Sequence, residues 1–225
     1  MSRIVPSRII KNNAIIDDEW TLVHLAPPAE EVVRKQAGKV VIFRITGEPA
    51  ATPEQIAETV IPDTGKIIIP LTVWLARKDA LSARFALGEI GVWLDSFEPL
   101  EELTGSLADI NSLPLIAINF PRFVDGRGFS MAALLRTRYG YKNELRSIGD
   151  VLRDQLFYMK RCGFDAYAIR ADKPAEEALA SLRDFSEPYQ GAVDNPLPVW
   201  RRHARVAHHA LAGSRIAMRH EDEVD

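Results

Sequence analysis

Short apolar runs alternate with amphipathic stretches through the middle of the chain. The apolar runs are rich in β-branched residues, and several are apolar throughout, as expected of strands that helices cover on both faces. The predicted strands are residues 66–75, 89–94, 113–120, 144–148 and 166–169. The predicted helices are residues 78–87, 98–110, 130–139, 151–162 and 174–185. Strands that alternate with helices of this length indicate βαβ units.

We therefore predict an α/β fold with a mainly parallel sheet of about five βα units, either an open sheet or a partial barrel. An N-terminal β-hairpin precedes these units, because the apolar runs 8–11 and 14–17 flank Asn12 and Asn13, which tolerate the positive φ of a tight turn. Two weaker patterns follow the hairpin, a short helix at 28–36 and a strand at 40–45.

The pattern divides the chain into three parts. Residues 1–60 hold the hairpin and linker elements. A helix is predicted to begin near their end, with Thr52 as its N-cap residue and Pro53 in its first turn. Residues 61–190 form the α/β core domain. Residues 191–225 hold a proline-rich turn and a charged tail that is either helical or disordered.

Composition places the protein among soluble globular chains. Apolar residues make up 47% and charged residues 26% of the 225 positions. No run reaches the roughly 18 apolar residues that a membrane helix needs, and the first residues lack the pattern of a signal peptide. The single cysteine, Cys162, fits a reducing compartment. We expect a cytoplasmic protein that does not contact a membrane.

Charge is distributed unevenly along the chain. The net charge of −3 argues against nucleic acid as a partner. Residues 121–161, however, contain nine basic and four acidic side chains, so this window carries a charge of +5. We call it the basic island. Such an island predicts a small anion or a docking partner as its ligand.

The scarcity of histidine and cysteine excludes several kinds of chemistry. No histidine lies between His24 and His203, and Cys162 is the only cysteine. Zinc, haem and iron–sulfur sites need several such ligands, and a serine or cysteine nucleophile needs a histidine base. We predict no metal site. No cofactor is evident, although a flavin remains possible.

The segment after the third predicted strand, residues 120–130, is the strongest candidate for a ligand site. Loops at the carboxyl ends of parallel strands carry ligands. Gly126 and Gly128 permit close approach of the backbone, and Ser130 can cap the next helix, whose free N–H groups suit an anion. The spacing is neither a dinucleotide-binding glycine motif nor a P-loop.

The arginines of this segment allow two interpretations. Arg122 or Arg127 could add charge-assisted hydrogen bonds to a bound anion. Alternatively, the segment is a tight strand-to-helix turn in which Arg127 pairs with Asp125. The sequence favours neither.

The loop after the next strand adds a candidate catalytic residue. Asp150 suits proton transfer, although it is also a natural N-cap, and Arg153 follows one turn later. The predicted anion- or cofactor-binding residues are Arg122, Asp125, Gly126, Arg127, Gly128, Ser130, Arg146, Asp150 and Arg153.

Residues 120–169 resemble a bacterial family of unknown function whose members are labelled as oxidoreductases involved in sulfite reduction. The specific elements are Asp-Gly-Arg-Gly-x-Ser, Gly-Asp-Val-Leu-Arg-Asp-Gln and Cys-Gly-Phe-Asp. The genes of that family tend to neighbour those for sulfite reductase. The resemblance therefore implies a role in assimilatory sulfur metabolism, but it supplies no catalytic residues.

Two hypotheses follow. In the first, the protein is an accessory protein or an oxidoreductase of assimilatory sulfite reduction, and the surface at 120–154 docks sulfite reductase or another sulfur-assimilation enzyme. In the second, it is an enzyme that binds the phosphate of a flavin, a nucleotide or a sulfonucleotide at the turn between Gly126 and Ser130.

Overall fold

We describe the fold from a computed structural model, which covers residues 8–26 and 51–202. The strands are β1 (Arg8–Lys11), β2 (Ala14–Asp17), β3 (Trp20–Leu22), β4 (Lys66–Pro70), β5 (Ile90–Asp95), β6 (Leu115–Phe120), β7 (Glu144–Gly149) and β8 (Ala166–Tyr167). The helices are α1 (Pro53–Glu58), α2 (Leu71–Arg77), α3 (Ser82–Ala86), α4 (Leu100–Gly105), α5 (Arg127–Thr137), α6 (Arg153–Cys162), α7 (Ala175–Ser181), α8 (Val199–Arg202) and the 3₁₀ turn η1 (Ile110–Ser112).

The eight strands form one mixed sheet in the order β2-β1-β8-β7-β6-β5-β4-β3. Strands β3 to β8 pair in parallel with one another, whereas β1 pairs antiparallel with both β2 and β8. The α/β class and the N-terminal hairpin are thus confirmed. The prediction of a mainly parallel sheet of about five βα units is wrong, because the hairpin and β3 enlarge the sheet to eight strands of mixed direction.

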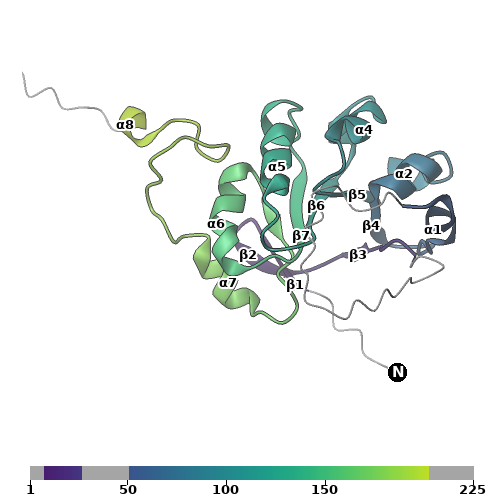
Figure 1. Ribbon diagram of the computed structural model, residues 1–225, viewed down its shortest axis with the longest axis horizontal. Coiled ribbons are helices and arrows are strands. Elements are labelled where there is room, and N and C mark those ends of the chain that lie inside the picture. Colours follow the sequence, from purple (N-terminus) through teal and green to yellow (C-terminus); the bar gives the residue numbers. More distant parts are fainter. Residues whose placement is uncertain (1–7, 27–50, 203–225) are drawn as a thin grey trace, which may run out of the picture.

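The two outermost strands are consecutive in the chain. Only Asp18 and Glu19 separate β2 from β3, yet these strands lie at opposite ends of the sheet order. Two residues span only about 10 Å, so the sheet must curl until its edges approach each other. Of the two predicted shapes, the partial barrel is therefore the one observed (Figure 1).

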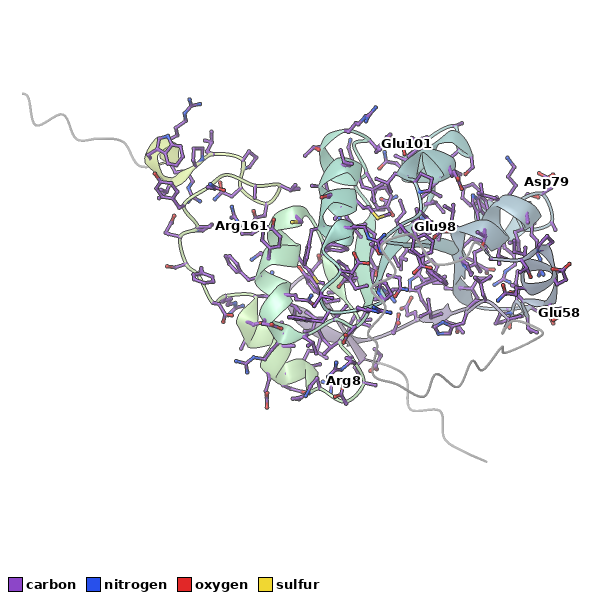
Figure 2. All side chains as sticks on the ribbon, in the orientation of Figure 1. Arg8, Glu58, Asp79, Glu98, Glu101 and Arg161 are labelled. Atoms are coloured by element: carbon purple, nitrogen blue, oxygen red, sulfur yellow. The ribbon has the colours of Figure 1, made fainter. Side chains whose placement is uncertain are left out.

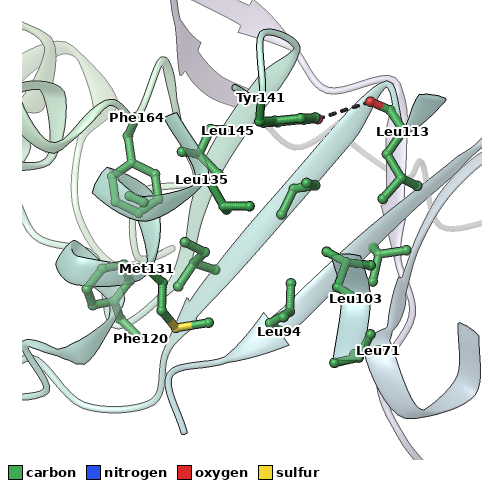
Figure 3. Packing of buried hydrophobic residues seen from close by; sticks show 14 of the residues in the cluster. Leu71, Leu94, Leu103, Leu113, Phe120, Met131, Leu135, Tyr141, Leu145 and Phe164 are labelled. Carbon is green, nitrogen blue, oxygen red and sulfur yellow. Dashed lines mark hydrogen bonds between the residues drawn. The ribbon is translucent and has the colours of Figure 1, made fainter. Parts of the chain in front are cut away.

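Helices cover the outer face of this half-barrel, where the larger core lies. Ile67, Leu94, Ile118 and Leu145 point outward from the central strands toward helix residues such as Leu135. Figure 3 shows this packing, including the hydrogen bond from the Tyr141 hydroxyl to the Leu113 carbonyl (3.1 Å). Burial of these side chains supplies the main stabilisation of the fold.

A second, smaller cluster lies on the inner face of the curled sheet. It contains Ile68, Trp93, Leu115, Ala117 and Ile148, all buried. Strand residues are therefore apolar on both faces, which explains why the sequence pattern does not alternate. Helices were predicted to cover both faces of the sheet. They cover the outer face, whereas on the inner face the side chains of the curled sheet pack against one another.

Several predicted boundaries need correction. The run 66–75 is not one strand, because Pro70 ends β4 and the apolar residues after it belong to α2, whose Leu71, Val73 and Trp74 are buried. The predicted helix 78–87 shrinks to α3, and the helix 98–110 divides into α4 and η1.

The turn chemistry, by contrast, was predicted correctly. Asn12 and Asn13 both adopt positive φ between β1 and β2, and Thr52 caps α1 with Pro53 in its first turn. The helix predicted at 28–36 and the strand predicted at 40–45 lie outside the described residues, as does most of the tail. The division at residues 60 and 190 stays a prediction. None of the helices described is both long and apolar enough to cross a membrane.

Candidate functional site at the carboxyl ends of the strands

Polar side chains converge where β5 and β6 end. Asp95 and Asn119 are partners in the parallel register, and the Asn119 amide donates a hydrogen bond to the Asp95 carboxylate (Nδ2 to Oδ1, 2.6 Å). The chain then turns, and the Asp95 backbone N–H donates to the Glu98 carboxylate (2.7 Å to Oε2). Three polar side chains are thereby joined at one point of the sheet edge.

Glu98 has the environment expected of a proton-transfer group. Burial raises its pKa from 4.5 to about 7, and the nearby carboxylates of Asp95 and Glu102 add to this effect. In Figure 2, Glu98 lies among the ends of the strands, whereas Glu101 lies at the rim of the molecule. A carboxyl group with a pKa near neutrality can act as a general acid or base.

The turn before α5 adds a second group of polar contacts. The Ser96 hydroxyl donates to Asp125 (2.6 Å), and Arg127 donates to the same carboxylate through Nε (2.9 Å), through Nη2 (2.6 Å) and through its backbone N–H (3.1 Å). The guanidinium also lies over the Phe97 ring (5.9 Å). The Arg127 guanidinium, together with Ser96, holds the pKa of Asp125 well below its usual range.

This geometry matches the second interpretation of the turn. The Asp125 carboxylate accepts a hydrogen bond from the backbone N–H of Arg127 at the start of α5. It therefore occupies the position at which a bound anion was expected. Gly126 is the N-cap residue of α5 and makes no side-chain cap, and Ser130 lies inside the first turn of the helix, so the prediction that Ser130 caps it is wrong. Gly128 is buried, and a Cβ there would lie 2.7 Å from the Phe120 ring, so its smallness serves packing.

Asp150 holds two neighbouring loops together. Its carboxylate accepts the backbone N–H of Phe123 (2.9 Å) and an Nη1–H of Arg170 (2.7 Å). Leu152, not Asp150, is the N-cap residue of α6, so the N-cap interpretation is wrong. Asp150 therefore connects the loops after β6, β7 and β8.

Two predicted site residues lie elsewhere, and a third is solvent-exposed. Arg146 is buried on the inner face of the sheet, where it pairs with Asp18 (2.9 Å) and Glu144 (2.7 Å). Arg153 is exposed on α6, 3.8 Å from Glu177. Arg122 is exposed in the loop after β6.

The basic island does not form one surface. Arg136, Arg146 and Arg161 are largely buried and donate to carbonyl groups or carboxylates of their own chain. Because α5 runs back along the sheet, Arg138 and Lys142 lie at the opposite end from Arg127. The sum of +5 therefore does not describe a single positively charged face.

Part of the chain is similar to a known protein family. Residues 91–200 match a family described as bacterial protein of unknown function (DUF934). No curated protein matches the chain. The DUF934 match starts within β5 and includes Asp95, Glu98, Asn119, Asp125 and Asp150. It agrees with the resemblance to a bacterial family of unknown function, while the link to sulfite reduction stays a prediction.

Sequence reasoning missed the β5 side of the site within this DUF934 region. Asp95, Ser96 and Glu98 follow a predicted strand directly, so the rule that selected residues 120–130 applied to them as well. The position of these residues after a strand therefore indicated a site. They form no recognisable motif, however, whereas the glycines and arginines after β6 have the composition of an anion site. Arg170 directly follows the predicted strand 166–169, so the same rule applied to it as well.

We found no metal site within residues 8–26 and 51–202, since no three histidine, cysteine, aspartate or glutamate side chains there are placed to hold an ion. Of the acidic side chains at the strand ends, Asp125 and Asp150 each pair with an arginine. The arrangement instead suits proton transfer and hydrogen bonding.

Proposed function

We propose that the protein is a cytoplasmic component of assimilatory sulfite reduction and that it acts there as an acid–base enzyme. Its working site would be the carboxyl edge, by which we mean Asp95, Glu98 and Asn119. The resemblance of residues 120–169 supports the pathway. The arrangement of the carboxyl edge supports the chemistry.

One observation carries the proposal. Glu98 is a carboxyl group with a raised pKa at the carboxyl end of a parallel strand, where α/β enzymes bind their ligands. In its protonated form Glu98 can donate a hydrogen bond or a proton to a ligand oxygen, and in its ionised form it can accept a proton. Asp95 and Asn119 would hold it in place through the hydrogen bonds described above.

This chemistry has better support than the two functions that rest on the basic island. Docking of sulfite reductase through a basic face needs exposed, clustered cations, and three of the nine are largely buried in structural pairs. A phosphate at the turn between Gly126 and Ser130 would compete with Asp125 for Arg127. Partner docking and flavin binding at the turn are therefore the weaker proposals.

Growth of a strain that lacks the gene tests the proposed function. We expect growth on cysteine but not on sulfate, and the wild-type gene should restore growth on sulfate. Glu98→Gln should fail to restore it, because the amide cannot transfer a proton. Glu101→Gln is the matched control, since Glu101 is an exposed residue of α4, and it should restore growth at equal protein level. Unimpaired growth of the deletion strain on sulfate would refute the role in sulfite reduction, and full rescue by Glu98→Gln would refute the acid–base role.

A further inference from the structure

A cavity of about 410 Å³ opens between α5, α6 and the segment after α7. Ala133 of α5 and Tyr158, Arg161 and Cys162 of α6 form one wall, and residues 188–193 form the other. Cavities that bind small molecules have volumes of roughly 300–1,000 Å³. This cavity lies outside the carboxyl edge and is not explained by it.

The outer wall is fixed by hydrogen bonds within the chain. The buried Arg161 side chain, labelled in Figure 2, donates to the Gln190 carbonyl and pairs with Asp194. The Val193 N–H donates to the Arg161 carbonyl (3.0 Å). Gly191 packs so closely that a Cβ there would lie 2.2 Å from the Pro196 carbonyl oxygen. A wall that is already ordered lowers the entropic cost of binding a ligand.

Aromatic rings flank the cavity, and the side chains between them are mostly apolar. Tyr158 and Tyr189 are 56% and 69% exposed, so their rings are accessible to a ligand in the cavity. Tyr189 also contacts the Trp200 ring (4.9 Å between centroids). Burial raises the pKa of the Cys162 thiol, so this group stays neutral and behaves as part of the apolar lining.

Hydrogen-bond donors lie on the same wall. Among the described residues, none accepts the backbone N–H groups of Gln190 or Gly191. An apolar lining, two flanking aromatic rings and free backbone donors together match a flat ring whose edge carries acceptor atoms.

We propose that this cavity binds a planar heteroaromatic ring system, of the kind found in flavins and nucleosides. The ring packs against Tyr158 and Tyr189, and its acceptor atoms bind the N–H groups of Gln190 and Gly191. This site is independent of the proposed function and lies apart from the turn between Gly126 and Ser130.

Titration of the full chain with riboflavin and with adenosine tests the proposal. Fluorescence reports riboflavin binding and calorimetry reports adenosine binding. We expect at least one of the two to bind. Because stacking on an aromatic ring contributes roughly 1–3 kcal/mol, Tyr158→Ala and Tyr189→Ala should each weaken binding by roughly 5- to 150-fold. Tyr158→Phe keeps the ring and should retain the affinity.

Phe123→Ala is the matched control, because Phe123 is an exposed aromatic residue beyond β6, away from the cavity. It should bind as the wild type does. Failure of both probes to bind overturns the proposal, as does equal affinity in the wild type and both tyrosine-to-alanine variants. Light scattering tests whether a second copy of the chain fills the cavity instead of a small molecule. If Tyr189→Ala converts a dimer to a monomer, the cavity is an interface between copies and the proposal fails. Melting curves confirm that each variant is folded, and no result here bears on growth on sulfate.

Discussion

The two ends of the curled sheet use the same kinds of side chain in different ways. Toward the amino ends of the strands, Lys11, Asp18, Glu144 and Arg146 form what we call the closure cluster. At the other end lies the carboxyl edge, with Asp95, Glu98 and Asn119. Both ends hold acidic groups that are at least partly buried. In the closure cluster each of them pairs with a cation, whereas the raised pKa of Glu98 marks a carboxyl group with a different environment.

Charges in the closure cluster compensate one another completely. Glu144 lies 2.6 Å from Lys11 and 2.7 Å from Arg146, and Arg146 lies 2.9 Å from Asp18. Asp18 belongs to the two-residue link between β2 and β3. Its ion pair with Arg146 of β7 therefore holds that link against the centre of the sheet. We interpret this cluster as a device for stability.

Glu98, by contrast, forms no ion pair with any described residue, and its pKa rises because of burial and neighbouring carboxylates. An arrangement of this kind costs stability and is typical of functional sites. The comparison teaches that buried carboxyl groups of this protein differ in their pairing as well as in their burial, and that the pairing separates the closure cluster from the site that we propose.

The largest effect is expected from Arg146→Met. Loss of the guanidinium leaves Glu144 and Asp18 without their buried partner, and breaking such a pair typically costs about 3–5 kcal/mol. Urea unfolding should show a loss of that size in the free energy of unfolding. Arg153→Met, the same change on the exposed face of α6, should alter it by less than about 0.5 kcal/mol. Similar stabilities for the two variants would contradict the structural role of the closure cluster.

The second effect is a pH dependence at the carboxyl edge. The folded protein holds the Glu98 proton up to a pH of about 7, whereas the unfolded chain releases it near 4.5. The unfolded state therefore binds fewer protons in this window, and the free energy of unfolding falls as pH rises from 4.5 to 7.

Glu98→Gln should remove this loss. Because Glu98 is partly exposed to solvent, we expect the variant to be roughly 1–3 kcal/mol more stable than the wild type at pH 8 and nearly equal to it at pH 4.5. Urea unfolding at both pH values checks this. A Glu98→Gln variant that is less stable at pH 8 would show that Glu98 is paired as the closure cluster is.

The smallest effect is expected from Arg127→Ala. The Arg127 side chain is 54% exposed, so its pair with Asp125 should contribute about 0.2–1 kcal/mol. The contribution of the ionised Asp125 is present above pH 3.8 and is lost as pH falls below it, because its pKa is lowered in the folded state. Melting curves of Arg127→Ala should show the full difference from the wild type at pH 7, and this difference should shrink only as pH falls from 3.8 toward the lowered pKa of Asp125.

The affinity of the same variant for sulfite distinguishes the two interpretations of the turn, an anion site and a structural pair of Arg127 with Asp125. Because Asp125 already occupies the start of α5, calorimetry should give the same result for Arg127→Ala and the wild type. A clear loss of sulfite binding in the variant would revive the anion site at the Gly126 turn.

The sequence predicted those parts of the fold that local chemistry determines. Two consecutive asparagines specified the hairpin turn, and Thr52 with Pro53 specified the start of α1. Strand β3 has only three residues, and its place beside β4 depends on tertiary pairing, which no local pattern reports. The run through Pro70 was misread because buried strand and buried helix residues are equally apolar.

The site was harder to predict for a similar reason. Asp125 and Asp150 lie in the strand-end loops in which the sequence pattern placed them. Arg146 was selected with them because the count of charges along the chain does not report which strand face a side chain occupies. The raised pKa of Glu98 arises from burial and from Asp95, and both depend on the fold.

Titration of the Glu98 carboxyl group tests the central claim most directly. Carbon-13 NMR of protein labelled at its glutamate carboxyl carbons follows each group from pH 3 to pH 9. We predict one carboxyl signal that titrates near pH 7 in the wild type, that is absent from Glu98→Gln and that persists in Glu101→Gln. If every glutamate titrates below about pH 5.5, or if the signal near pH 7 survives in Glu98→Gln, Glu98 is not the proton-holding group of the carboxyl edge.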